Sequence, residues 1–348
     1  MTEYSISEAF RRIEAELIQS IMDNLDKHRA QETAEGLDWE MWQVLQLKEL
    51  EKYRKRNAKK FDNRFDELNE QIAELFTEAQ DRGMEEANVL RDILLGDFKE
   101  PSYGVNTEKV DALIKATVND MKKAEHAVLR KANDEYRKII FNAQAYMAQG
   151  GTYEKAVDMA TRDFIRNGIQ SIVYKNGARH QISDYARMAL RTGNKRAYLM
   201  GLGEQMKRMG VHTVRVNRRS GACPYCARWL GKVLVDDVYG GGTKAEAKAK
   251  GLPLLSQAIS EGFLHPNCKD VYSIYIEGVS EEVKPYTKKE RLKLSETYSL
   301  EQQLERSKGI AESYKRLADN ALDESMREKY RVLQNKWEEK VKALEEQV

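Results

Sequence analysis

The segment FDNRFDELNEQIAELFTEA, residues 61–79, has an apolar residue at alternating intervals of four and three. These intervals place the apolar side chains on one face of an α-helix, because each is close to one helical turn. A stripe of this heptad-like form requires a second helix against it. We interpret it as part of a helical hairpin within the chain, with an intermolecular coiled coil as the alternative. The stripe consists of Phe61, Phe65, Leu68, Ile72, Leu75 and Ala79.

The chain before this segment is also expected to be helical. Apolar residues recur every three or four positions from Phe10 onward, after Ser5 and Glu8, which have the spacing of a capping box. A second helix is expected to begin at Asp38. No proline precedes Pro101, so the first hundred residues contain nothing that prevents long helices.

The middle of the chain continues the helical pattern with interruptions. Residues 96–106 contain two glycines and a proline, which predicts a break. Residues 107–149 are helical again. Residues 152–208 are predicted to form several shorter helices, interrupted at Gly168 and at Asn176-Gly177.

A short region of β character follows. Residues 211–216 alternate with a period of two, and residues 232–236 and 271–277 are rich in β-branched and aromatic side chains. Three such short strands predict a small antiparallel sheet.

The C-terminal part of the chain is charged and helical. Ser299-x-x-Gln302 and Ser325-x-x-Glu328 are further capping-box candidates. One apolar stripe runs through residues 326–348. Because a single helix buries little surface by itself, this tail is expected to pack on the body of the protein or on a partner.

These patterns predict a mainly α protein with a small α+β module. Four consecutive segments are expected: long N-terminal helices in 1–100, a helical middle region in 101–208, a compact three-stranded antiparallel module stapled by zinc in 209–280, and amphipathic helices in the tail, 281–348.

Composition excludes several classes of protein. Among 348 residues, 58 basic and 56 acidic side chains leave a net charge of +2, so no global basic field indicates a nucleic-acid coat. Charged residues make up 33% and mean hydropathy is −0.70, which favours long solvated helices. No apolar run reaches the roughly 18 residues of a membrane helix, and no signal peptide is expected.

One group of cysteine and histidine residues has the spacing of a metal-binding site. Cys223-Pro-Tyr-Cys226 is followed, after 38 residues, by His265-Pro-Asn-Cys268, and these contain all three cysteines of the chain. Two such turns supply the four ligands of a tetrahedral zinc site, for which Cys3His is a common set. We therefore predict zinc bound by Cys223, Cys226, His265 and Cys268.

Four protein ligands would close the coordination shell and leave no position for an activated water, so the predicted site is structural and not catalytic. Two alternatives remain open. The cysteines can be small buried hydrophobic residues in a metal-free fold, or Cys223 and Cys226 can be a redox pair. Trp229 is expected to pack over the site.

Other catalytic or cofactor-binding arrangements are not evident. The sequence has no phosphate-binding glycine loop and no nucleophile elbow, so we expect no enzyme activity and no small-molecule substrate. Basic clusters at residues 52–60 and 215–219 are candidates for contact with DNA. The alternative functions are a zinc-stabilised nucleic-acid-binding protein and a treble-clef nuclease, which needs a second cluster of His, Asn or Asp.

Several segments, in order, resemble the minor capsid proteins of tailed phages, specifically the phage minor capsid protein 2 group, which is related to the Mu-type minor head morphogenesis proteins. The segments are YKNGARH at 174–180, YARM at 185–188, VNRRSGACPYC at 216–226, GFLHPNC at 262–268, and LER and YKR at 304–306 and 314–316. The sequence departs from the group after the last cysteine, where Lys269 and Asp270 replace a basic residue followed by His or Cys. This removes one candidate ligand.

The resemblance implies a structural protein of the virion head that acts in head morphogenesis, DNA packaging or ejection. The implied partners are the portal, the major capsid protein, or both, with contact to packaged DNA and self-association as further possibilities. The implied location is the capsid interior or the portal vertex, with the host cytoplasm during assembly.

Overall fold

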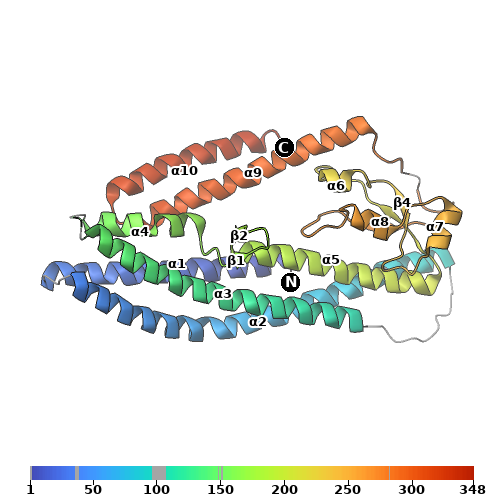
Figure 1. Ribbon diagram of the computed structural model, residues 1–348. Coiled ribbons are helices and arrows are strands. Elements are labelled where there is room, and N and C mark those ends of the chain that lie inside the picture. The colour runs from blue at the N-terminus through green and yellow to red at the C-terminus, as the bar shows by residue number, and fades with distance from the viewer. Residues whose placement is uncertain (1, 36–38, 96–106, 148, 150–151, 282) are drawn as a thin grey trace. The chain divides into compact units, whose positions relative to one another are not determined.

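The computed structural model describes residues 2–35, 39–95, 107–147, 149, 152–281 and 283–348. Within them the chain is mainly helical with a small antiparallel sheet, as the sequence predicted (Figure 1). The helices are α1 (Glu3–Glu35), α2 (Trp39–Leu95), α3 (Glu108–Met147), α4 (Tyr153–Asn167), α5 (Ile182–Met209), α6 (Pro224–Ala227), α7 (Lys244–Lys250), α8 (Leu255–Ser260), α9 (Lys288–Asn320) and α10 (Glu324–Glu345). The strands are β1 (Ile172–Val173), β2 (Arg179–His180), β3 (Thr213–Val216), β4 (Val233–Val235) and β5 (Tyr272–Ile274).

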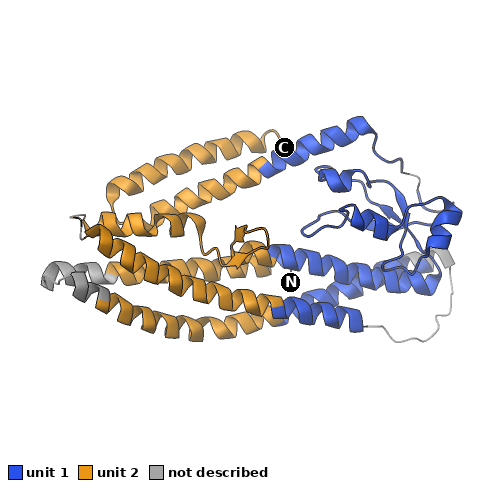
Figure 2. Ribbon diagram, in the orientation of Figure 1, with its two compact units in different colours: residues 1–3, 70–119, 187–302 blue, residues 4–69, 120–186, 303–348 orange. Residues whose placement is uncertain are grey.

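The chain divides into two compact units, each drawn from three separated stretches (Figure 2). Unit 1 comprises residues 1–3, 70–119 and 187–302, and unit 2 comprises residues 4–69, 120–186 and 303–348. The division into four consecutive segments stays a prediction about sequence organisation. The expected break at 96–106 and the expected helix start at Asp38 lie outside the described residues.

Among the described helices, none is long and apolar enough to cross a bilayer.

In unit 2 the apolar stripe of α1 packs against the part of the α2 stripe that precedes residue 70. Phe10 on α1 stacks on Phe65 of α2 with ring centroids 6.1 Å apart, and the Tyr53 hydroxyl of α2 donates to the carbonyl of Leu17 at 3.1 Å. Phe61 is fully buried. In this part of the chain the stripe of α2 is therefore covered by a helix of the same chain, as the intramolecular interpretation predicted.

Helix α10 and residues 303–320 of α9 belong to unit 2, where contacts are made at both ends of α10. The buried carboxylate of Asp158, on α4, accepts the backbone N–H groups of Leu322 and Asp323 at 2.9 Å each, where α9 turns into α10. Lys308 on α9 pairs with Glu345 at the far end of α10, at 2.8 Å. The tail therefore packs on the body of its own chain, the first of the two outcomes expected for it.

Three predicted helix starts were wrong, because capping boxes were assigned from Ser-x-x-Glu/Gln spacing alone. Ser5, Ser299 and Ser325 all lie inside helices. The side chain of Asp323 caps α10 by accepting the Met326 N–H at 3.0 Å. Ahead of α9, Thr287 and Glu290 form the reciprocal pair, with the Glu290 carboxylate accepting from Thr287 and the Thr287 hydroxyl accepting from Glu290 N–H.

A hairpin between α4 and α5 was not predicted. Helix α4 ends at Asn167 before Gly168, as expected, but β1 and β2 then pair antiparallel, with Ile172 opposite His180. Asn176-Gly177 forms the turn: Gly177 has φ of 82°, and the Asn176 side chain accepts the N–H of Ala178 at 3.0 Å. Asn-Gly is a strong hairpin signal, but two-residue strands leave no visible alternation.

Glu14 is a buried carboxyl in the core of unit 2. Its Oε1 accepts the N–H of Ile169 at 2.6 Å. Burial raises the pKa of Glu14 to about 8, although this hydrogen bond and the guanidinium groups of Arg316 and Arg11 oppose the shift, and Asp184 adds to it. The carboxyl is therefore held mainly protonated at neutral pH.

This carboxyl predicts a pH dependence of stability. A folded-state pKa raised above the unfolded value means that the folded chain binds the proton more tightly, so stability falls as pH rises from about 4.5 to about 8. At pH 7 the loss is on the order of 3 kcal/mol. Glu14→Gln keeps an acceptor for Ile169 and should raise the melting temperature at pH 8 much more than at pH 5. The control is Glu67→Gln, at an exposed site on α2, which should change the melting temperature equally little at both pH values. If both variants shift the melting temperature equally, the assignment of the pH dependence to Glu14 is wrong.

In unit 1, α2 and α5 approach closely at glycines. A Cβ on Gly201 of α5 would overlap the backbone carbonyl of Gln80, and one on Gly193 would overlap the ring of Phe76. Only glycine permits these contacts without a shift of the helices. The close packing places α5 beneath the sheet module and so positions the side chains described next.

The sheet of unit 1 has strand order β4-β3-β5, with both pairs antiparallel. Val214 at its centre pairs with Leu234 on β4 and with Ile274 on β5. All three strands lie within the predicted ranges, so the predicted three-stranded antiparallel sheet is confirmed.

Candidate metal centre

The first pair of predicted ligands sits on a tight turn that begins α6. Cys223 is the N-cap residue, with extended backbone, and Pro224 occupies the first helical position, where a missing N–H costs nothing. The carbonyl of Cys223 accepts the N–H groups of Cys226 and Ala227 at 3.1 and 2.9 Å. This turn directs the two thiols to the same side.

The second pair sits on a turn of similar form after α8. The N–H of Cys268 donates to the carbonyl of His265 at 3.0 Å. Leu264 precedes the turn and Asn267 lies within it, with φ of 53° and 62°, a backbone conformation that residues other than glycine rarely adopt. Asn267 is held there by the Thr192 hydroxyl, which accepts its N–H at 3.0 Å.

The structure brings the four predicted ligands into two overlapping groups, one of Cys223, Cys226 and His265 and the other of Cys226 and Cys268 with Asp270. Cys223 Sγ lies 3.2 Å from His265 Nε2, and Cys226 Sγ lies 3.5 Å from Cys268 Sγ. The ligand atoms of Cys223, Cys226 and His265 all lie within 4.8 Å of one another. Tetrahedral ligands about 2.0–2.3 Å from a zinc ion would be ~3.5–3.8 Å apart. The two printed separations are close to these values, so the cluster could hold a metal ion.

The imidazole of His265 has the tautomer that a ligand needs. Its Nδ1 lies 2.8 Å from the carbonyl oxygen of Pro266, which can only accept a hydrogen bond. Nδ1 is therefore the nitrogen that donates to this carbonyl, and Nε2 is the nitrogen that faces Cys223. Metal-bound histidines are commonly oriented in this way by a partner on the other nitrogen.

Charged groups surround the thiols. Lys195 of α5 donates to the carbonyls of Cys268 and Asp270, the latter at 2.7 Å. Arg219 pairs with the buried carboxylate of Asp270 at 2.6 Å. The thiol of Cys226 lowers the pKa of Cys268 to about 7, assisted by the ammonium of Lys195, while burial opposes the shift.

Asp270 and Lys195 are site residues that the sequence did not reveal. The backbone N–H of Asp270 donates to Cys268 Sγ at 3.3 Å, and its carboxylate lies within 4.8 Å of the Cys226 and Cys268 thiols. Asp270 is two residues from a ligand and was noted only as a departure from the family pattern. Lys195 is 73 residues from Cys268 along the chain, so no local signal connects the two.

The cluster is part of the hydrophobic core of the sheet module. Cys226 is fully buried, and Cys223 and Cys268 are nearly so. Trp229 is buried in the same cluster, as expected, together with residues from β3, α8, β5 and α9. Because all three thiols are buried in this core, the site links the two turns to the sheet.

The basic residues of 215–219 are already occupied. Arg215 donates to the carbonyl of Glu281, Arg218 lies over the ring of Tyr286 at 3.7 Å, and Arg219 pairs with Asp270. These contacts stabilise the module, and the expected contact of this cluster with DNA stays a prediction. Within the described residues, the groups of three potential metal ligands all lie at this one site, so the second cluster of a treble-clef nuclease is not among them.

The chain matches the family model described as phage minor capsid protein 2 over residues 2–344. The chain belongs to this family. The match confirms the resemblance found in the sequence and extends it to nearly the whole chain. A member of the phage minor capsid protein 2 family is a structural protein of the capsid, which places this chain in the virion and among capsid proteins. No curated protein and no solved structure matches it.

Proposed function

We propose that this minor capsid protein is a low-copy component of the phage head, located at the portal vertex or on the inner capsid surface, and acts in head morphogenesis, DNA packaging or ejection. The family match over nearly the whole chain carries the proposal. The long charged helices support it, because they offer extended surfaces for protein partners. No observation favours the nucleic-acid-binding alternative.

We further propose that Cys223, Cys226, His265 and Cys268 hold a structural zinc ion. The buried thiols, the Nε2 of His265 that faces Cys223 and the short ligand separations support it. With four protein ligands the metal has no open position, so its role is to stabilise the module. The module contains one short sheet and three short helices. Because its own hydrophobic core is small, a bound metal ion would add to its folding stability.

An interior location predicts protection from protease. Treatment of intact heads with trypsin should leave the chain uncleaved, although its many lysines and arginines make the free protein a good substrate. Opening the heads before treatment should expose it. The measurement is an immunoblot of the two digests. Equal cleavage in intact and opened heads would place the chain outside the capsid and contradict the proposal.

A structural role predicts no hydrolytic activity. Incubation of the purified protein with supercoiled plasmid in the presence of Mg²⁺, Mn²⁺ or Zn²⁺ should leave the plasmid uncut. A chelator-treated sample is the control. Cleavage that one substitution among the four predicted ligands abolishes would overturn both the non-enzymatic assignment and the structural role of the site.

A further inference from the structure

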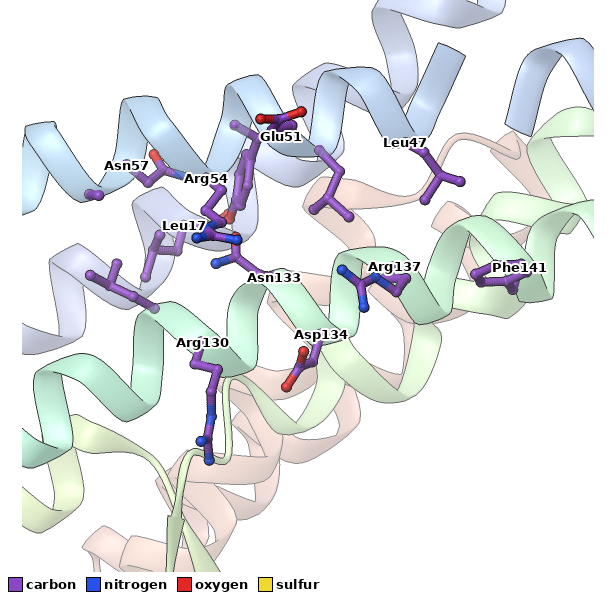
Figure 3. Close-up of a pocket in the computed structure, with 14 residues that line it drawn as sticks. Leu17, Leu47, Glu51, Arg54, Asn57, Arg130, Asn133, Asp134, Arg137 and Phe141 are labelled. Carbon is purple, nitrogen blue, oxygen red and sulfur yellow. The ribbon is translucent and has the colours of Figure 1, made fainter. Parts of the chain in front are cut away.

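A groove in unit 2 runs along α2 and α3 over the buried Leu17 of α1 (Figure 3). Its volume is about 860 Å³. The lining residues span 47–58 on α2 and 129–141 on α3, which corresponds to about 17 Å of helix at 1.5 Å per residue. A groove of this length accommodates about three turns of another helix.

The groove has apolar side chains exposed to solvent. Leu47 on α2 and Phe141 on α3 are 36% and 49% exposed, next to the buried Leu50 and Leu17. An open apolar surface of this kind is typical of a binding surface.

The charges of the groove select the occupant. Arg54, Arg130 and Arg137 line it, and within the described residues none of the three forms an ion pair. Figure 3 shows the guanidinium groups of Arg54 and Arg137 between α2 and α3. Of the two acids, Glu51 is paired with Lys55 at 3.0 Å, which leaves Asp134 alone against three arginines.

We propose that this groove binds an acidic amphipathic helix of another head protein. Leucine-like side chains of that helix cover Leu47 and Phe141, and its carboxylates pair with Arg54 and Arg137. Nucleic acid fits less well, because the apolar floor offers nothing to phosphate and Asp134 repels it. This inference rests on the proposed head function, since the partner is expected only in the assembled particle.

Photo-crosslinking in assembled heads tests the groove. Phe141 is replaced by p-benzoylphenylalanine, which keeps an aromatic ring at the site, and heads carrying this chain are irradiated. The control places the same group at Leu292, which is 60% exposed on α9 in unit 1. We expect a crosslink from position 141 to one acidic, amphipathic segment of another head protein, identified by mass spectrometry. A crosslink to DNA or to a second copy, or none above the Leu292 control, would overturn the proposal.

Charge reversal provides the second measurement. R54E/R137E should reduce the crosslink at least tenfold, while K48E/K59E should not; these lysines are exposed on α2 and do not line the groove. Circular dichroism melts confirm that both variants fold. Equal losses from both variants would contradict the groove as the site. If the unmodified chain is missing from heads, the proposed head function is wrong. If the chain is present in heads but position 141 gives no crosslink, only the groove proposal is wrong.

Discussion

Cys226→Ser should remove the bound metal and unfold the Cys/His module, residues 209–280, while most of the helical signal remains. Serine is a poor zinc ligand, and structural zinc sites contribute about 10–16 kcal/mol of apparent binding free energy, which becomes folding free energy. The helical signal persists because only α6, α7 and α8 lie entirely within the module. Metal analysis after dialysis should give one zinc per native chain and much less for the variant, with new proteolytic cleavage inside 209–280.

The matched control is Tyr225→Phe, between the two cysteines. Tyr225 is 63% exposed, so the substitution leaves the ligands and the buried core intact and should retain full zinc content. A native chain that is well folded with far less than one equivalent of metal would contradict the zinc assignment. It would favour the alternative in which the three cysteines are simply small buried residues.

Truncation after Lys284 should strongly destabilise unit 2. It removes α9 and α10 and with them the buried side chains of Leu304, Leu317 and Tyr330. Burial of each large apolar side chain contributes about 1.5–3 kcal/mol. It also leaves the buried carboxylate of Asp158 without the two N–H groups it accepts. A much lower melting temperature and aggregation on size-exclusion chromatography are the expected results.

Deletion of residues 346–348 is the control for the truncation. These residues are exposed and follow the last helical residue, so their removal should leave the melting temperature unchanged. If the chain truncated after Lys284 stays soluble and melts like the native protein, the tail is not part of the core. If that soluble chain is also missing from assembled heads, the tail is the docking element and not a part of unit 2.

The features that the sequence predicted well are periodic or paired. The apolar stripes of α1 and α2 are buried because helical periodicity determines which face can pack, and the three strands lie where β-rich segments occur. The two ligand pairs converge because a two-residue gap on a tight turn directs both side chains to one side. Each of these signals depends on neighbouring residues, so one sequence is enough to detect it.

The features that the sequence did not predict depend on contacts between distant segments. Lys195 approaches the cysteines only because α5 packs beneath the module, where Gly201 permits close approach to α2. The capping boxes failed for a different reason: Ser299 and Ser325 have suitable spacing, but the local caps of α9 and α10 are the Thr287–Glu290 pair and Asp323. The groove on α2 and α3 requires two helical segments that are distant in sequence, 47–58 and 129–141, to lie side by side.

The presence of this chain in the finished particle is the most direct test of the account. Quantitative mass spectrometry of purified, DNA-filled heads should detect the chain at a few copies per particle, far below the major capsid protein, and the amount should not fall on repeated purification. A chain that is abundant in the infected-cell lysate but absent from the purified heads would contradict its assignment as a structural head protein.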